Sequence, residues 1–132
     1  MNSTEPRSLL EWATIIGTSD QRGWLRKYNC HEIAMLLWRH KDYVVALEDG
    51  VEPAGLAIGI PKDDGETIHI AFIVTFVEGA MEKFQQLLKK LYPNATQISY
   101  LRRYTLQHTA IDELHKMIPS RQVNQKQNVA TN

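Results

Sequence analysis

The stretch IHIAFIVTFVEGAMEKFQQLLKKLYP, residues 68–93, changes its hydrophobic period in the middle, and this change decides the fold. In residues 68–76 both the even-numbered and the odd-numbered positions are mostly apolar. Because these positions lie on opposite faces of a strand, the pattern predicts a central strand covered on both faces. One face of this strand should carry Ile68, Ile70, Phe72, Val74 and Phe76. From Gly79 onward the apolar residues recur at helical spacing and stop before Pro93, which predicts an amphipathic helix.

The flanking segments extend this strand and helix into a sheet. Short apolar runs at residues 43–48 and 54–60, around the turn sequence DGVEP, predict two strands that form an antiparallel meander with the central one. Residues 95–103, ATQISYLRR, alternate like a fourth strand. Because a strand–helix–strand crossover joins parallel strands, the fourth strand should run parallel to the third. We expect a last helix within residues 108–118, with Ile111, Leu114 and Ile118 on its apolar face.

Two helices should precede the sheet. The first is expected at residues 6–16, with Pro6 in its first turn and Gly17 at its end. The second is expected at residues 30–40, where Asn29 and Glu32 have the spacing of a capping box. We expect Trp12 and Trp38 to pack in the core and Trp24 to be a contact residue. The predicted class is α/β (α+β), a mixed sheet with helices on both faces.

The composition limits the classes of function. A chain of 132 residues with 43% hydrophobic content is suited to one domain, expected at residues 1–118, followed by a polar tail at 119–132. Cys30 is the only cysteine, which excludes an internal disulfide and a thiolate-rich zinc site. Fifteen basic residues balance fifteen acidic ones, so nucleic acid is not indicated as a partner. We also expect no metal, no membrane span and no signal peptide, in keeping with an intracellular protein.

The run from IHIAFIVTF to ISYLRR, with the meander before it, resembles the GCN5-related N-acetyltransferase (GNAT) fold, shortened at its first strand. The likeness covers roughly residues 43–117. Within that superfamily the chain is similar to small GNAT-like proteins of tailed bacteriophages, some of them internal virion proteins. A weaker likeness is to toxin-activating lysine acyltransferases, whose catalytic aspartate would fall at about Ala71. The phage likeness implies location in the host cytoplasm or in a virion.

The resemblance gives the junction at Gly79 a specific expected role. Enzymes of this fold hold the pyrophosphate of acyl-CoA on backbone amides at this helix start, where the helix dipole favours an anion. Here Gly79 and the amides of Ala80 and Met81 would be the cofactor-binding groups. The family motif, Gln/Arg-x-x-Gly-x-Gly/Ala, is incomplete, because Phe76 and Met81 stand where the first and last residues belong. Gly79 could equally be a simple hinge between strand and helix.

Other residues could complete an acyltransferase site. His69, which should share a face with Thr75, is a candidate general base, because the pKa of histidine lies near neutrality. The resemblance implies a tyrosine as general acid, and Tyr104 is preferred to Tyr100. Arg102 and Arg103, with nearby lysines on the preceding helix, could bind the 3′-phosphate of CoA, nucleic acid or an acidic protein face. All of these side chains also have ordinary roles in packing or solvation.

Two functions therefore remain open. The first is a degenerate GNAT-like protein, of phage type, that needs no cofactor and acts through contacts with a protein partner or with itself. The second is an active N-acyltransferase that uses acetyl-CoA or another acyl-CoA. A gap between the third and fourth strands that is lined by backbone amides would favour the enzyme. A gap closed by Phe76 and Met81 would favour the contact protein.

Overall fold

The structure, a computed structural model, describes residues 7–19 and 28–117. The chain divides into two compact units, Tyr43–Met117 and a second made of Met1–Asp42 with Ile118–Asn132, and each is described by itself. Pro6, Trp24, Ile118 and the expected polar tail at 119–132 lie outside the described residues. No helix in the described ranges is long and apolar enough to cross a membrane.

The N-terminal unit contains helices α1 (Leu9–Gly17) and α2 (Cys30–Arg39). The start of α1 lies later than expected because Ser8 caps it, forming a capping box with Glu11. The predicted capping box of α2 is confirmed: the backbone N–H of Glu32 donates to Asn29 Oδ1 at 2.8 Å, and the N–H of Asn29 donates to Glu32 Oε1 at 2.9 Å. Both helix starts are therefore specified by local side chains.

The two tryptophans of these helices differ in burial. Trp12 is buried, as are Ala13 and Ile16 on the same helix. Trp38 is 63% exposed, so its predicted core position is wrong. Lys41 Nζ lies 4.0 Å from the centroid of the Trp38 ring, and this cation–π contact leaves most of the indole in solvent.

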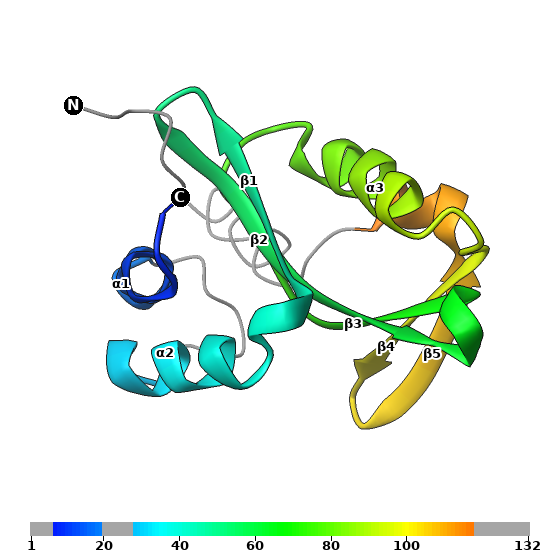
Figure 1. The fold of residues 1–132 in the computed structure, drawn as a ribbon, viewed down its shortest axis with the longest axis horizontal. Coiled ribbons are helices and arrows are strands. Elements are labelled where there is room, and N and C mark those ends of the chain that lie inside the picture. Colours follow the sequence, from blue (N-terminus) through cyan, green and yellow to red (C-terminus); the bar gives the residue numbers. More distant parts are fainter. Residues whose placement is uncertain (1–6, 20–27, 118–132) are drawn as a thin grey trace, which may run out of the picture. The chain divides into compact units, whose positions relative to one another are not determined.

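The second unit is built on a five-stranded mixed sheet (Figure 1). Its strands lie in the order β1-β2-β3-β4-β5, and only the β3–β4 pair is parallel. The elements are β1 (Val44–Asp49), β2 (Glu52–Lys62), β3 (Thr67–Thr75), α3 (Ala80–Leu91), β4 (Gln97–Arg102), β5 (Thr105–Ala110) and the 3₁₀ helix η4 (Ile111–Lys116). The α+β class, the mixed sheet and the parallel fourth strand are confirmed.

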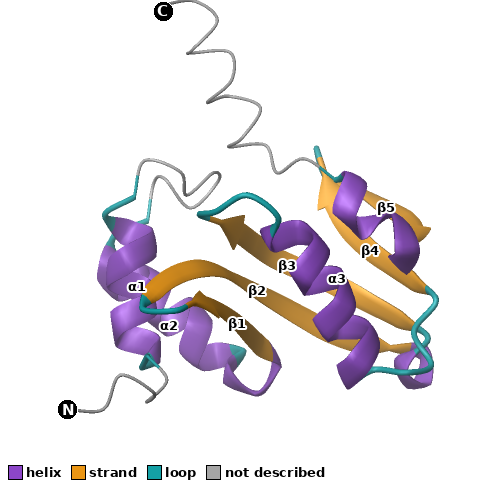
Figure 2. Cartoon of the chain, turned by 90° about the horizontal axis from the view of Figure 1, so that it is seen from above, coloured by secondary structure: helices purple, strands orange, loops and turns teal. Residues whose placement is uncertain are grey.

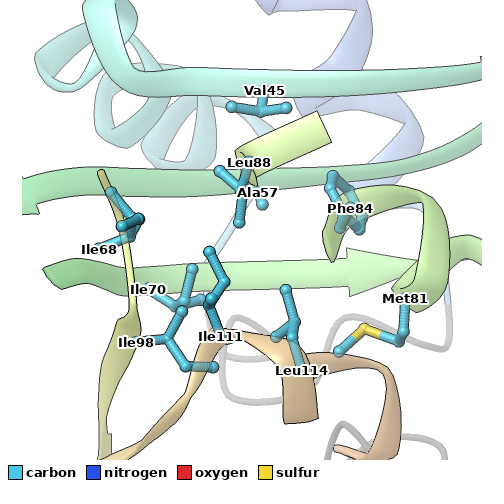
Figure 3. Close-up of a cluster of buried hydrophobic side chains, with 11 residues drawn as sticks. Val45, Ala57, Ile68, Ile70, Met81, Phe84, Leu88, Ile98, Ile111 and Leu114 are labelled. Atoms are coloured by element: carbon cyan, nitrogen blue, oxygen red, sulfur yellow. The ribbon is translucent and has the colours of Figure 1, made fainter. Parts of the chain in front are cut away.

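Helix α3 lies across one face of this sheet, next to η4 (Figure 2). A cluster of buried apolar side chains lies where the sheet, α3 and η4 meet (Figure 3). Its members are Val45, Ala57, Ile68, Ile70, Met81, Phe84, Leu88, Ala95, Ile98, Ile111 and Leu114. The helix approaches β2 closely at Gly55, where a Cβ atom would lie 2.9 Å from the Phe84 ring. Burial of this apolar surface is the main source of stability in the unit.

A β-bulge in β3 overturns the predicted face of the central strand. Ile58 pairs with Phe72, but Gly59 pairs with Ile70, so Ala71 is an extra residue. Because one extra residue reverses the alternation, Ile68 and Ile70 lie on the α3 face while Phe72 lies on the opposite face. The expectation of a single face for all these residues is wrong.

The predicted helix at residues 108–118 is also wrong. Residues 105–110 form β5, which returns antiparallel to β4 after a two-residue turn at Arg103 and Tyr104, and only η4 is helical. Ile111 and Leu114 are nevertheless buried, as their spacing predicted. The spacing of one short helical turn is the same in a 3₁₀ segment, so periodicity alone did not separate the two structures.

Candidate functional site

The start of α3 has the backbone form that the junction predicted. Gly79 is the N-cap of the helix, with φ of 81°, and no side chain caps it. The first intrahelical donor is Lys83 N, which bonds the Gly79 carbonyl at 3.2 Å, so the preceding N–H groups have no partner within the helix. This geometry suits an anion. However, Glu78 and Glu82 are exposed beside it and would repel a pyrophosphate.

The side chains of the same junction point into the core. Ala80 is 1% exposed and Met81 8%. Figure 3 shows the Met81 side chain running toward Leu114 beside β3, and both belong to the buried cluster. Strands β3 and β4 pair only from Thr67 to His69, after which they diverge (Figure 1). On the α3 face, apolar side chains including Met81 therefore fill the space beside the end of β3.

His69, the proposed base, lies far from this junction. It is on the sheet face opposite α3, whereas Thr75, expected on the same face as His69, is on the α3 side because of the bulge. At about 3.3 Å per residue, six residues of strand place His69 roughly 20 Å from Thr75. No common site with Gly79 results.

His69 instead belongs to a row of three polar side chains across β3, β4 and β5. Ser99 pairs with His69 on one side and with His108 on the other, and Ser99 Oγ is hydrogen-bonded to His69 Nδ1 at 2.9 Å. Burial lowers the pKa of His69 below the 6.5 usual for histidine, and the charges of Lys62 and His108 lower it further. Both effects favour the neutral form of the imidazole.

The tyrosines occupy different surroundings. Tyr104, the proposed acid, is fully exposed at the tip of the β4–β5 hairpin, with φ of 68°. Tyr100 packs against the buried cluster, on the α3 side of β4. General acid catalysis needs the donor within hydrogen-bond reach of the leaving group. The exposed position of Tyr104 places it in solvent and not against Gly79.

The basic residues also separate into two groups. Lys89 forms an ion pair with Asp112 of η4, so its charge is neutralised locally. Arg102 and Arg103 are exposed at the hairpin, and no ion pair joins either of them to a described residue. His115 lies on η4, where its backbone N–H and its Nδ1 both contact Gln85 Oε1. Among residues 7–19 and 28–117, no group of three or more His, Cys, Asp or Glu could hold a metal ion.

Two features of this region were not found from the sequence. The sequence does not mark Ser99, because its neighbours come from β3 and β5, and residues 108–110 of β5 were expected in a helix. The turn at Arg103 and Tyr104 was missed because neither residue is a usual turn former. In TLQHTA only Leu106 and Ala110 are apolar, so the segment carries no clear strand period. Comparison with protein-family models, curated proteins and solved structures finds no match to this chain.

Proposed function

We propose that the chain is a degenerate GNAT-like protein that works through protein–protein contacts, within a phage virion, in its assembly or with a host protein. The observation that carries this proposal is the β4–β5 hairpin. Leu101 and Leu106 face each other across it and are 64% and 51% exposed, beside the fully exposed Tyr104. Apolar and aromatic side chains held in solvent on a defined backbone are typical of interaction sites.

The arrangement of the other candidate residues supports contacts over chemistry. His69 and Gly79 are at opposite ends of β3, Tyr104 is at a hairpin tip, and Met81 is packed in the core. Acid–base catalysis requires such groups to converge on one reacting atom. Helix α2 adds a second exposed apolar pair, Met35 and Trp38, one turn apart. These residues offer contact area without a catalytic constellation.

Photo-crosslinking tests this proposal directly. A benzophenone amino acid replaces Tyr104 in one variant and Leu91 in another, since Leu91 is 51% exposed but lies at the end of α3. We expect a discrete protein adduct, in cells that make the chain, from position 104 and not from position 91. Equal labelling from both positions, or none from 104, would contradict a contact function of the hairpin.

The active acyltransferase is kept as a second candidate because of one observation, the uncapped start of α3 at a glycine with positive φ. In this alternative the amides of Gly79, Ala80 and Met81 hold the pyrophosphate of an acyl-CoA. Melting with acetyl-CoA or CoA separates the two functions, because a ligand at about a hundred times its Kd adds roughly 2.7 kcal/mol. We expect no shift. A shift of several degrees that Gly79→Glu abolishes would establish the enzyme instead.

A further inference from the structure

The outer edge of β5 presents backbone hydrogen-bonding groups to a partner. β5 is the last strand of the sheet, and in the described part of the chain it pairs only with β4. The pair Arg102–Thr105 closes the two-residue turn, and Ile111 N donates to the Thr96 carbonyl at 2.9 Å. Hydrogen-bonded pairs alternate with non-hydrogen-bonded pairs along two antiparallel strands, and these two contacts fix which pairs are bonded. The odd-numbered residues of β5 therefore bond to β4. The N–H and C=O groups of Leu106, His108 and Ala110 point outward.

Within its own residues, this edge strand has neither the charges, the proline nor the bulge that usually prevent strand addition. Natural edges carry charged residues, proline or a bulge that prevents pairing with another chain. The six residues of β5, TLQHTA, include no Lys, Arg, Asp, Glu or Pro, and the β4–β5 register is regular throughout. The edge is therefore suited to accept an additional strand.

The turn beside this edge has an unfavourable conformation that its own contacts do not explain. Arg103 and Tyr104 have φ of 51° and 68°, the values of a type I′ turn, which strongly favours Asn and Gly. Both side chains are nevertheless exposed. Such backbone conformations in non-glycine residues concentrate at binding sites. This turn holds a cation and an aromatic ring in solvent at the N-terminal end of β5.

The charge at the turn indicates the kind of partner. Arg102 and Arg103 have no ion pair with described residues, whereas Lys89 and Lys116 are paired with Asp112 and Glu113 near the other end of β5. Among the described residues near the two ends of β5, the unpaired positive charge therefore lies at the turn end. An arginine guanidinium binds carboxylates well, so the partner should be acidic at this end.

We propose that the outer edge of β5 binds an extended acidic segment of another protein as a sixth, antiparallel strand. The C-terminal end of the segment lies beside the turn, where its carboxylates meet Arg102 and Arg103. Its apolar side chains lie beside Leu106, which shares one face of the hairpin with Leu101. This inference rests on the proposed contact function and specifies its surface and the chemistry of its partner.

Amide exchange on the full chain, followed by NMR, tests the added strand. The probe is an acetylated and amidated octapeptide of three Thr-Val repeats that ends in Glu-Glu. We expect exchange at Leu106, His108 and Ala110 to slow at least tenfold, with Gln107 and Thr109 already protected. Two controls carry Glu-Glu at the N-terminus or Lys-Lys at the C-terminus. Both should bind about fivefold more weakly, the effect expected of two exposed ion pairs.

Two variants separate the edge from the charge. His108→Pro removes an outward donor while leaving the bonds to β4 in place, so peptide binding should be lost, whereas His108→Ala should retain it. Arg102→Glu/Arg103→Glu should reverse the preference in favour of the Lys-Lys peptide. If His108→Pro fails to fold, exchange at Leu106 and Ala110 in the wild type still tests the edge, and the charge reversal tests the charge of the partner.

Three results would overturn the proposal. One is protection of the outward amides in the protein alone, in which case light scattering shows whether a second copy or the chain itself covers the edge. Another is binding of all three peptides with equal affinity. The third is an unchanged exchange rate with every peptide. If Tyr104 still crosslinks while the outward amides stay unprotected, the contact function holds and only the added strand is wrong; if neither occurs, both fail.

Discussion

His69 shows how the position of a single side chain decides which role it can have. As a candidate base it was expected on the same face as Thr75, but the bulge at Ala71 places the two on opposite faces of the sheet. There, burial and nearby positive charge favour the neutral imidazole. Its hydrogen bond to Ser99 links β3 to β4 near the point where these strands separate. The residue is thus part of the sheet and not of a site at Gly79.

The lowered pKa of His69 predicts a pH dependence of stability. Because the folded pKa lies below the unfolded value of 6.5, the unfolded chain binds more protons between these two values. The free energy of unfolding contributed by His69 is therefore complete above pH 6.5 and lost as the pH falls toward the folded pKa. We expect the drop in melting temperature between pH 7.5 and pH 5.5 to be smaller in His69→Gln than in the wild type. A drop in His69→Gln equal to that of the wild type would contradict this assignment.

At the scale of elements, the packing of α3 on β2 depends on small residues in the strand. A Cβ at Gly55 would lie 2.7 Å from the Val74 carbonyl oxygen, a rigid backbone atom of β3. A Cβ at Gly59 would meet side-chain ends, the nearest being Ile68 Cγ2 at 3.1 Å. The two glycines therefore differ in how well their neighbours can adjust.

This difference predicts unequal costs of the same substitution. Gly55→Ala should lower the free energy of unfolding by about 1–3 kcal/mol, the usual penalty of overpacking. Gly59→Ala should cost less, because the methyl groups around it can shift. Denaturant unfolding of the two variants measures this directly. Equal costs would show that α3 moves as a body to relieve both contacts.

The hairpin of β4 and β5 is an element whose turn residues oppose its conformation. A left-handed conformation costs an L-residue roughly 1–2 kcal/mol, and Arg103 and Tyr104 both adopt it. Arg103→Asn/Tyr104→Gly should therefore raise the free energy of unfolding by about 1 kcal/mol, because the gain is reduced by the flexibility of glycine in the unfolded chain. The same variant, carrying an affinity tag, should no longer retain the partner that crosslinking from position 104 identifies. A more stable variant that still binds the partner would show that the strained turn is not needed for binding.

At the scale of the whole sheet, the order of strands predicts an order of local stability. β2 and β3 are internal, and their side chains on the α3 face join the buried cluster, while β1 and β5 are edges. Amides of internal strands exchange through global unfolding, which needs about 5–15 kcal/mol, and edges open more easily. We expect the amides of β3 to be the slowest in hydrogen exchange and those of β5 to be at least tenfold faster. Equal protection of β5 and β3 in the free protein would contradict the edge position of β5.

The sequence by itself determined the features that depend on neighbours a few residues apart. The capping box of α2, the change of period across Gly79 and the approximate positions of β3, α3 and β4 follow from local spacing. The parallel direction of β4 followed from the chirality and length of one crossover. Gly79 was also expected correctly at the junction, with its positive φ available to glycine alone without strain.

Only the tertiary structure decided which of these residues meet. The bulge at Ala71, the pairing of His69 with Ser99 and the identity of β5 as a strand depend on hydrogen bonds between segments distant in the chain. A one-residue shift in such a pairing moves every following side chain to the other face of the sheet, and the spacing of apolar residues in the sequence does not reveal the shift. For this reason the candidate residues could be named from the sequence, while their separation, and the exposed edge beside Arg103 and Tyr104, could not.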